Sequence, residues 1–146
     1  MTIDAVYNSK LLEFAGNIPR IGRLDAPDGS AKAHSKLCGS TVSVDVMTDG
    51  ERVTDYAHDV KACALGQAAA SILAANVIGA TMDELVQGRE ELRAMLKEDG
   101  GAPTGRFAEL EFLSPVKEYR ARHASTMLAY DAVVQAMEQA LARHAA

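Results

Sequence analysis

Polar and apolar side chains alternate in one stretch of the chain, which predicts β-structure. The valines at positions 42, 44 and 46 fall on one face of an extended segment, and Asp49-Gly50 is typical of a hairpin turn. A further strand is expected around residues 32–37. The pattern therefore predicts three antiparallel strands within about residues 32–61.

Apolar residues recur at helical spacing on both sides of this stretch. A first helix is predicted from Val6 to Ala15, followed by a loop rich in Gly and Pro at residues 16–31. Beyond residue 63, an alanine-rich run predicts a buried helix that ends near Gly79. The spacing of the apolar residues therefore changes at this point from every second residue to about every 3.6 residues.

The last third of the chain predicts further helices. Thr81 followed by Glu84 indicates a capping box that opens a helix ending at Gly100. A short helix, a break near Pro115 and a long C-terminal helix are expected after it. The C-terminal helix carries an apolar stripe of Met127, Tyr130, Val134, Met137 and Leu141.

The order of these elements indicates the fold class. Strands followed by helices predict an α+β fold, with a three-stranded antiparallel sheet packed against four to five helices. The chain has 146 residues, of which 48% are hydrophobic and 24% charged, so residues 1–146 are expected to form a single domain with a substantial core.

Charge and hydropathy exclude several classes of partner. The formal net charge is −5, whereas domains that bind nucleic acid usually carry a basic surface. No apolar run approaches the ~18 residues that span a bilayer, and the first residues lack a secretory leader pattern. We therefore expect a cytoplasmic protein with neither nucleic acid nor membrane as partner.

Two cysteines are the main candidates for chemistry. A secreted disulfide framework needs more than two, and a reducing cytosol would keep both as thiols. Cys63 opens the alanine-rich helix, where unpaired N–H groups favour a thiolate that acts as a nucleophile or metal ligand. Alternatively, Cys63 is a small buried apolar residue. Cys38 precedes Gly39, where a backbone can approach a ligand closely, so the pair is consistent with a soft-metal or sulfur site.

Four segments carry motifs of one known family: Asn17, Pro19, Arg20 and Gly22; Cys38-Gly39; Ala62-Cys63; and VKEYRARHASTMLAY at 116–130. The first segment resembles a loose Asn-Pro-Arg-x-x-Gly element. Cys38-Gly39 resembles a Cys-Gly-Asp motif, and Ala62-Cys63 resembles a Gly-Cys helix start. Residues 116–130 resemble the segment that contains the family's third cysteine. This is the NifU N-terminal/IscU/SufU family of iron–sulfur cluster assembly scaffolds. The 25-residue step between the cysteines and the extra segment at about 90–112 resemble the SufU branch.

The chain departs from the family pattern at two site positions. Ser40 stands where the family has an aspartate, and Ser125 stands where it has the third cysteine. A shift of one residue would place Ala124 there instead, next to His123. A neutral hydroxyl is a poor ligand for soft metals. Arg122 matches a basic residue that the SufU branch keeps near its site.

The resemblance implies a scaffold or sulfur acceptor in iron–sulfur cluster assembly, rather than an enzyme. A sulfurtransferase-like role, with Cys63 as the catalytic nucleophile, is the enzymatic alternative. The implied partners are a pyridoxal-phosphate (PLP)-dependent cysteine desulfurase and apo iron–sulfur proteins. Zinc, iron or a labile cluster would be bound weakly by Cys38 and Cys63, helped by Ser40, His123 or Ser125. The sulfurs of Cys38 and Cys63 are then expected to lie within about 10 Å of each other.

Three alternatives stay open at this point. A degenerate relative would keep the fold and serve as a partner-binding or regulatory module without metal. The two thiols would otherwise form a redox site, as a disulfide or as an acceptor of persulfide sulfur. His34 and His58, a few residues before each cysteine, are weaker candidates for a metal ligand than His123.

Overall fold

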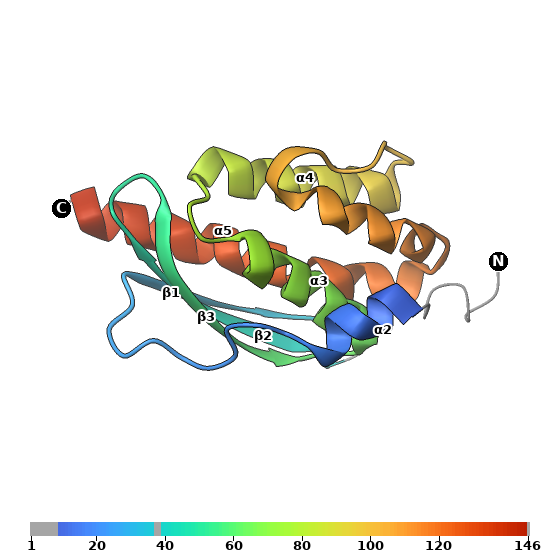
Figure 1. Ribbon diagram of the computed structural model, residues 1–146, viewed down its shortest axis with the longest axis horizontal. Coiled ribbons are helices and arrows are strands. Elements are labelled where there is room, and N and C mark those ends of the chain that lie inside the picture. The colour runs from blue at the N-terminus through green and yellow to red at the C-terminus, as the bar shows by residue number, and fades with distance from the viewer. Residues whose placement is uncertain (1–8, 37–38, 146) are drawn as a thin grey trace.

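The computed structural model describes residues 9–36 and 39–145 of the chain. Its elements, shown in Figure 1, are α2 (Ser9–Gly16), β1 (Gly29–His34), β2 (Thr41–Thr48), β3 (Val53–Lys61), α3 (Ala64–Asn76), α4 (Met82–Lys97), the 3₁₀ segments η1 (Gly105–Glu118) and η2 (Arg120–Arg122), and α5 (His123–Ala145).

The strands form one antiparallel sheet in the order β1-β2-β3, and the helices lie on one side of it (Figure 1). Helices α3 and α5 contact the sheet, whereas α4 packs on α5 and η1, and α2 and η1 pack on α3. The valines at 42, 44 and 46 are fully buried on this face, because alternate residues of a strand point to the same side. The hairpin turn follows Thr48, as predicted. The predicted α+β fold with a three-stranded antiparallel sheet is therefore confirmed.

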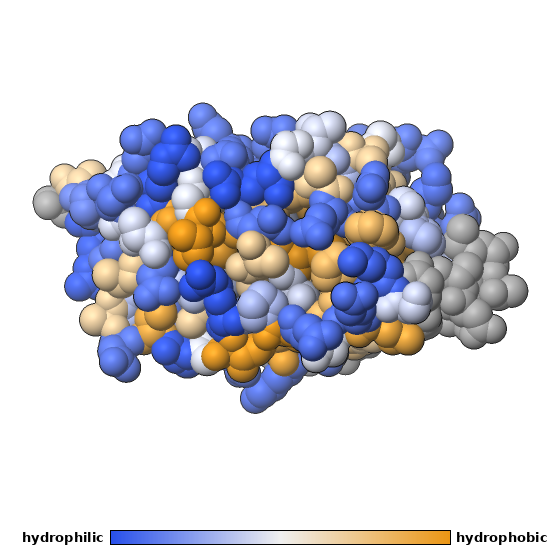
Figure 2. All heavy atoms as spheres, viewed as in Figure 1, coloured by the Kyte–Doolittle hydropathy of each residue, from blue (hydrophilic) through white to orange (hydrophobic). Residues whose placement is uncertain are grey.

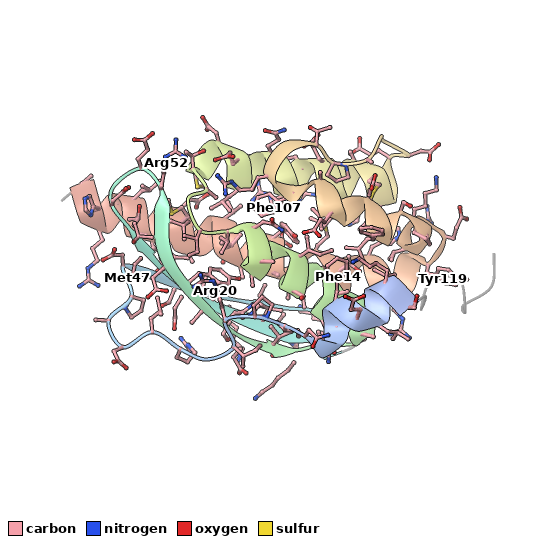
Figure 3. The ribbon with its side chains drawn as sticks, viewed as in Figure 1. Phe14, Arg20, Met47, Arg52, Phe107 and Tyr119 are labelled. Carbon is pink, nitrogen blue, oxygen red and sulfur yellow. The ribbon has the colours of Figure 1, made fainter. Side chains whose placement is uncertain are left out.

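The long helix α5 lies along β1 and β2 and forms the centre of the core. Met127, Tyr130, Val134 and Met137 of its predicted stripe are buried, and Leu141 packs at the edge. The Tyr130 hydroxyl donates to the Ala69 carbonyl of α3 at 3.2 Å. Phe107, labelled in Figure 3, meets the Tyr130 ring edge-on, with centroids 5.9 Å apart. These contacts join α3 and η1 to α5.

The capping box of α4 is confirmed. The Thr81 hydroxyl accepts from the Glu84 amide at 3.2 Å, and the Glu84 carboxylate accepts from the Thr81 amide at 3.1 Å. The two bonds satisfy N–H groups that the start of a helix leaves without an intrahelical partner.

Several predicted boundaries differ from the structure. Strand β1, which was expected at about residues 32–37, begins at Gly29. Helix α3 ends at Asn76, before Gly79. The predicted break near Pro115 is wrong, because η1 continues to Glu118 and the chain turns at Tyr119 (Figure 3). Proline lacks an N–H, but a 3₁₀ segment made of short turns loses only a local bond there. The predicted start of the first helix at Val6 lies outside the described residues.

Arg106 of η1 joins the end of α3 to the start of α4. Its guanidinium donates to the carbonyls of Asn76 and Ile78 at 3.1 Å each and of Gly79 at 3.3 Å. It also donates to the Glu84 carboxylate at 3.0 Å. A cation at a helix C-terminus satisfies carbonyls that have no partner within the helix, so this arginine holds three elements together.

Figure 2 shows apolar surface only in small patches among polar groups on the face in view. In the described part of the chain, four large apolar side chains are exposed: Leu12, Ile21, Ile78 and Phe112. Among the same residues, no helix has both the length and the apolar character that crossing a membrane requires.

A buried carboxylate joins the sheet to the loop before β1. Asp45 of β2, 1% exposed, accepts from the Arg23 guanidinium at 2.7 and 2.9 Å and from the Ser30 hydroxyl at 2.6 Å. The Leu24 amide adds a bond at 3.0 Å. The Arg23 hydrogen bonds, foremost, lower the pKa of Asp45 to about 2, although burial opposes the shift. The ionised form of Asp45 therefore stabilises the fold.

We expect this carboxylate to make the protein less stable in acid. The pKa of Asp45 is about 2 in the folded chain, against ~3.9 for a free aspartate. Its contribution is present above pH ~4 and is lost as the pH falls through ~2. The shift corresponds to about 2 to 3 kcal/mol at neutral pH. Urea unfolding of Asp45→Asn should show this loss at neutral pH and a smaller one at pH ~3.

The exposed Asp25 provides the control for this experiment. Asp25→Asn should leave the stability near that of the parent protein at both pH values. An Asp45→Asn protein as stable as the parent at neutral pH would contradict the assigned role.

Candidate functional site

Cys63 lies in the two-residue connection between β3 and α3. It is the N-cap residue of α3, with φ −66° and ψ 170°, and its side chain makes no capping bond. The thiol is free and half-buried. The sulfur instead contacts α5, where Cys63 Sγ lies 3.2 Å from Ser125 Oγ. A residue 62 positions later in the sequence therefore forms part of the immediate surroundings of the thiol.

The close approach of α3 and α5 depends on Gly66. A Cβ atom at Gly66 would lie 2.8 Å from Ser125 Oγ and 3.1 Å from the Ser125 carbonyl oxygen. Real Cβ atoms almost never come within 3.0 Å of another heavy atom that is not bonded nearby. The glycine therefore leaves the space that the Ser125 side chain occupies beside Cys63.

Ser125 and Ala124 were both candidates for the third-cysteine position. Ser125 is 1% exposed, and it is the one whose side chain hydrogen bonds to Cys63. Ala124 lines a surface hollow of about 760 Å³ with His123, between the ends of α4 and η1 and the start of α5. Ser125 is therefore the one of the two whose side chain contacts Cys63, and which of them holds the third-cysteine position stays a prediction.

His123 is a buried side chain, 6% exposed, at the start of α5. Its Nε2 lies 3.0 Å from the Val116 carbonyl and 3.2 Å from the Lys117 carbonyl. Carbonyl oxygens only accept, so Nε2 carries the proton and donates to them. Only Nδ1 remains for a metal, and the ligand role of His123 stays a prediction.

Two other predicted site residues lie close to this region in the fold. Ser40 is buried and follows Gly39, which has φ +70°. The next residue, Thr41, pairs with Lys61, so Ser40 and the Cys63 connection leave the sheet at the same end. Arg122 is half-buried in η2, and its carbonyl accepts from the Thr126 hydroxyl at 2.7 Å. Their roles in a site stay predictions.

Cys38 lies outside the described residues, and so does the predicted distance between the two sulfurs. The weaker ligand candidates are described. His34 is exposed at the end of β1. His58 is fully buried, with Nε2 2.8 Å from the Pro19 carbonyl and Nδ1 3.5 Å from the Tyr56 hydroxyl.

The contacts of His58 indicate a structural role. Burial lowers its pKa, so the neutral imidazole is favoured. The ring holds the loop that runs beside β3. Arg20, labelled in Figure 3, lies in this loop and has a left-handed φ of 60°. Such a φ is uncommon for a residue with a side chain, and the bonds to His58 on both sides of the turn stabilise it.

The structure adds Gln67, which sequence reasoning missed. Its side-chain Nε2 donates to the Ala62 carbonyl at 2.9 Å, and its backbone amide donates to the Cys63 carbonyl at 2.9 Å. The available signal was a long polar side chain four residues after the cysteine, in a run of otherwise small or apolar residues.

Residues 6–145 match the family described as the NifU-like N terminal domain. The chain belongs to this family. The resemblance inferred from the sequence motifs is therefore confirmed at the level of the NifU-like family, whereas placement in the SufU branch stays a prediction.

Solved and curated relatives agree with this assignment. The crystal structure of a nitrogen-fixing NifU-like protein (N-terminal) from Brucella abortus is 58% identical, with a TM-score of 0.91, and the match covers 94% of this chain and 96% of that one. The iron–sulfur cluster assembly scaffold protein IscU of Thermotoga maritima is 22% identical over 139 residues, which are 95% of this chain and 97% of the relative.

A scaffold protein for the SUF system from Fervidobacterium islandicum AW-1 shares the fold. It is 17% identical with a TM-score of 0.83, and the match covers 90% of this chain and 96% of that one. At this identity, the likeness concerns the fold alone.

The described residues of this NifU-like chain do not by themselves fit a closed metal site. Within residues 9–36 and 39–145, no three His, Cys, Asp or Glu side chains are grouped so that they would hold a metal ion. The described donors beside each other are one thiol and one hydroxyl, whereas structural zinc sites use four ligands, usually Cys and His. Further donors are needed for zinc or a cluster.

Proposed function

We propose that this NifU-like protein is an iron–sulfur cluster assembly scaffold that accepts sulfur at Cys63. The observation that carries the proposal is the contact of Cys63 Sγ with Ser125 Oγ at 3.2 Å. Cys63 matches the second cysteine of the family pattern, and Ser125 stands where the resemblance expects the third cysteine, so the contact brings these two positions together. Relatives of this family are named as iron–sulfur cluster assembly scaffold proteins, which supports the role.

The surroundings of Cys63 suit a thiol that receives and passes on sulfur. It is half-buried and free, so a partner can reach it, and it opens a helix whose N-terminus favours a negative charge. The Ser125 hydroxyl is able to donate a hydrogen bond to this sulfur. We propose a PLP-dependent cysteine desulfurase as the sulfur donor and apo iron–sulfur proteins as recipients.

Weak binding of the cargo follows from the proposed ligands. Cys38 and Cys63 would supply two thiolates, while Ser40 and Ser125 supply neutral hydroxyls at the remaining family positions. Zinc, iron or a cluster held in this way would exchange easily. A reducing compartment such as the cytoplasm would keep both thiols available.

The two serines also support a second candidate function. A relative that has lost two ligand positions would keep the fold and bind partners without metal, as a regulatory module. Sulfur transfer to Cys63 distinguishes the two, because the second function does not need a reactive thiol.

We expect Cys63 to take up sulfur from a cysteine desulfurase. The chain is incubated with the desulfurase and L-cysteine, and mass spectrometry then detects the added sulfur on an intact peptide. The parent protein should carry it at Cys63, and Cys63→Ser should lose this signal, because only a thiolate attacks the enzyme persulfide.

Cys38→Ser serves as the matched control, since it removes the other thiol of the chain. It should keep the sulfur at Cys63. Absence of sulfur on the parent protein, or equal sulfur on the Cys63→Ser variant, would refute the proposal.

A further inference from the structure

The backbone around Cys63 is held by one side chain. Strand β3 ends at Lys61, which pairs with Thr41, so the Ala62 carbonyl lies beyond the ladder. Gln67 Nε2 donates to this carbonyl at 2.9 Å. The Gln67 amide donates to the Cys63 carbonyl, also at 2.9 Å, and closes the first turn of α3. Gln67 therefore donates hydrogen bonds to the carbonyls of both Ala62 and Cys63.

The direction of the thiol depends on this backbone. Cys63 does not cap α3 with its side chain, so no bond between its sulfur and the helix fixes its position. Its contact with Ser125 is instead set by the Cys63 backbone angles and by the position of α5. Gly66 provides the room for α5, and Gln67 fixes the peptide that carries the thiol.

We propose that Gln67 is a positioning residue, which holds the Cys63 sulfur toward position 125. The bond to Ala62 acts through the peptide between Ala62 and Cys63, without a contact between the glutamine and the sulfur. Loss of the side-chain donor leaves the Ala62 carbonyl to water and allows this peptide to turn. The consequence for metal or sulfur binding rests on the proposed scaffold function. The effect of Gln67 on the position of the Cys63 sulfur does not depend on that function.

Gln67→Met tests the proposal, because methionine keeps the length and helix propensity of glutamine but removes the amide donor. The variant is made together with Cys38→Ser, so that Cys63 is the only thiol of the chain. The rate of Cys63 alkylation by iodoacetamide is then measured from pH ~6 to pH ~10, where thiols ionise. At pH ~10, where the thiol is ionised, we expect the rate in Gln67→Met to rise about threefold or more, because the sulfur is then no longer held against Ser125 and the reagent reaches it more easily. This is the order of change that one lost hydrogen bond produces.

Gln87→Met is the matched control. Gln87 lies on α4 and donates a side-chain bond to Glu91 at 3.0 Å, so this variant loses a comparable bond away from the thiol. It should leave the alkylation rate unchanged. An unchanged rate in Gln67→Met overturns the proposal, and so does a faster rate that follows a fall in the thermal midpoint, because general unfolding would then explain it.

Cobalt binding to the chain with both cysteines gives a second measurement. Co²⁺ bound by thiolates has a charge-transfer absorption that reports ligation directly. We expect Gln67→Met to weaken this binding about tenfold, as substitution of residues behind metal ligands commonly does. If the parent protein binds no cobalt, the metal part of the proposed function fails, while the alkylation rates still decide the role of Gln67.

Discussion

Replacement of Gly29 by alanine is expected to lower the free energy of unfolding by about 3 kcal/mol, the upper end of the usual cost of overpacking. Gly29 opens β1 directly against the backbone of α5. A Cβ atom there would lie 1.9 Å from the Ala136 carbonyl oxygen and 2.8 Å from the Ala140 amide nitrogen. Backbone atoms cannot rotate away as a side chain would. The strand would have to lift off the helix and lose contacts along its length.

Urea unfolding of the purified variant measures this loss. Gly101→Ala is the control, because nothing lies within 4 Å of a Cβ atom at that position. Its stability should stay within about 0.5 kcal/mol of the parent value, as for most surface substitutions. A Gly29→Ala protein as stable as the control would show that β1 does not pack on α5 as described.

Ser125→Cys is expected to strengthen zinc or cobalt binding about a hundredfold or more. A third thiolate adds a charged soft ligand where the chain has a neutral hydroxyl, and such ligands share the ~10–16 kcal/mol of structural zinc sites. The contact of Ser125 with Cys63 at 3.2 Å places the new sulfur next to the first one. The gain should grow as the pH rises, because the metal competes with a proton for the sulfur.

Ala124→Cys is the control for this substitution, since Ala124 lines the neighbouring hollow beside His123. Metal affinity is measured by competition with a chromophoric chelator, under reductant so that no disulfide forms with Cys63. The control should bind metal like the parent protein. Equal affinity of all three proteins would mean that position 125 is outside the site, and the ligand assignments would fail with it.

Local signals in the sequence were sufficient for most of the fold. The alternating valines from 42 to 46 are all buried, and Thr81 with Glu84 forms the predicted capping box. Each of these signals acts within a few residues along the chain, so its meaning does not depend on distant contacts. The break expected near Pro115 is not found, because Pro115 lies within the 3₁₀ segment η1, and short 3₁₀ turns tolerate proline.

The site was less accessible to sequence reasoning, because its contacts join distant parts of the chain. The position of Ser125 came from the family resemblance, and the structure supplied its contact with Cys63. The roles of Gly66 and Gln67 depend on how α3 meets α5 and β3, which no local pattern specifies. Asp45 was missed for the same reason, since its partners lie across the sheet and in the preceding loop.

The gap at Gly66 has an evolutionary consequence. The backbones of α3 and α5 fix the space beside Cys63, and serine fills it with nearly the same volume as cysteine. Most serine codons are a single nucleotide from a cysteine codon. A lineage with this fold is therefore able to exchange serine and cysteine at position 125 without passing through a misfolded intermediate. If this position carries a ligand, as proposed, the strength of ligation can change while the fold is conserved.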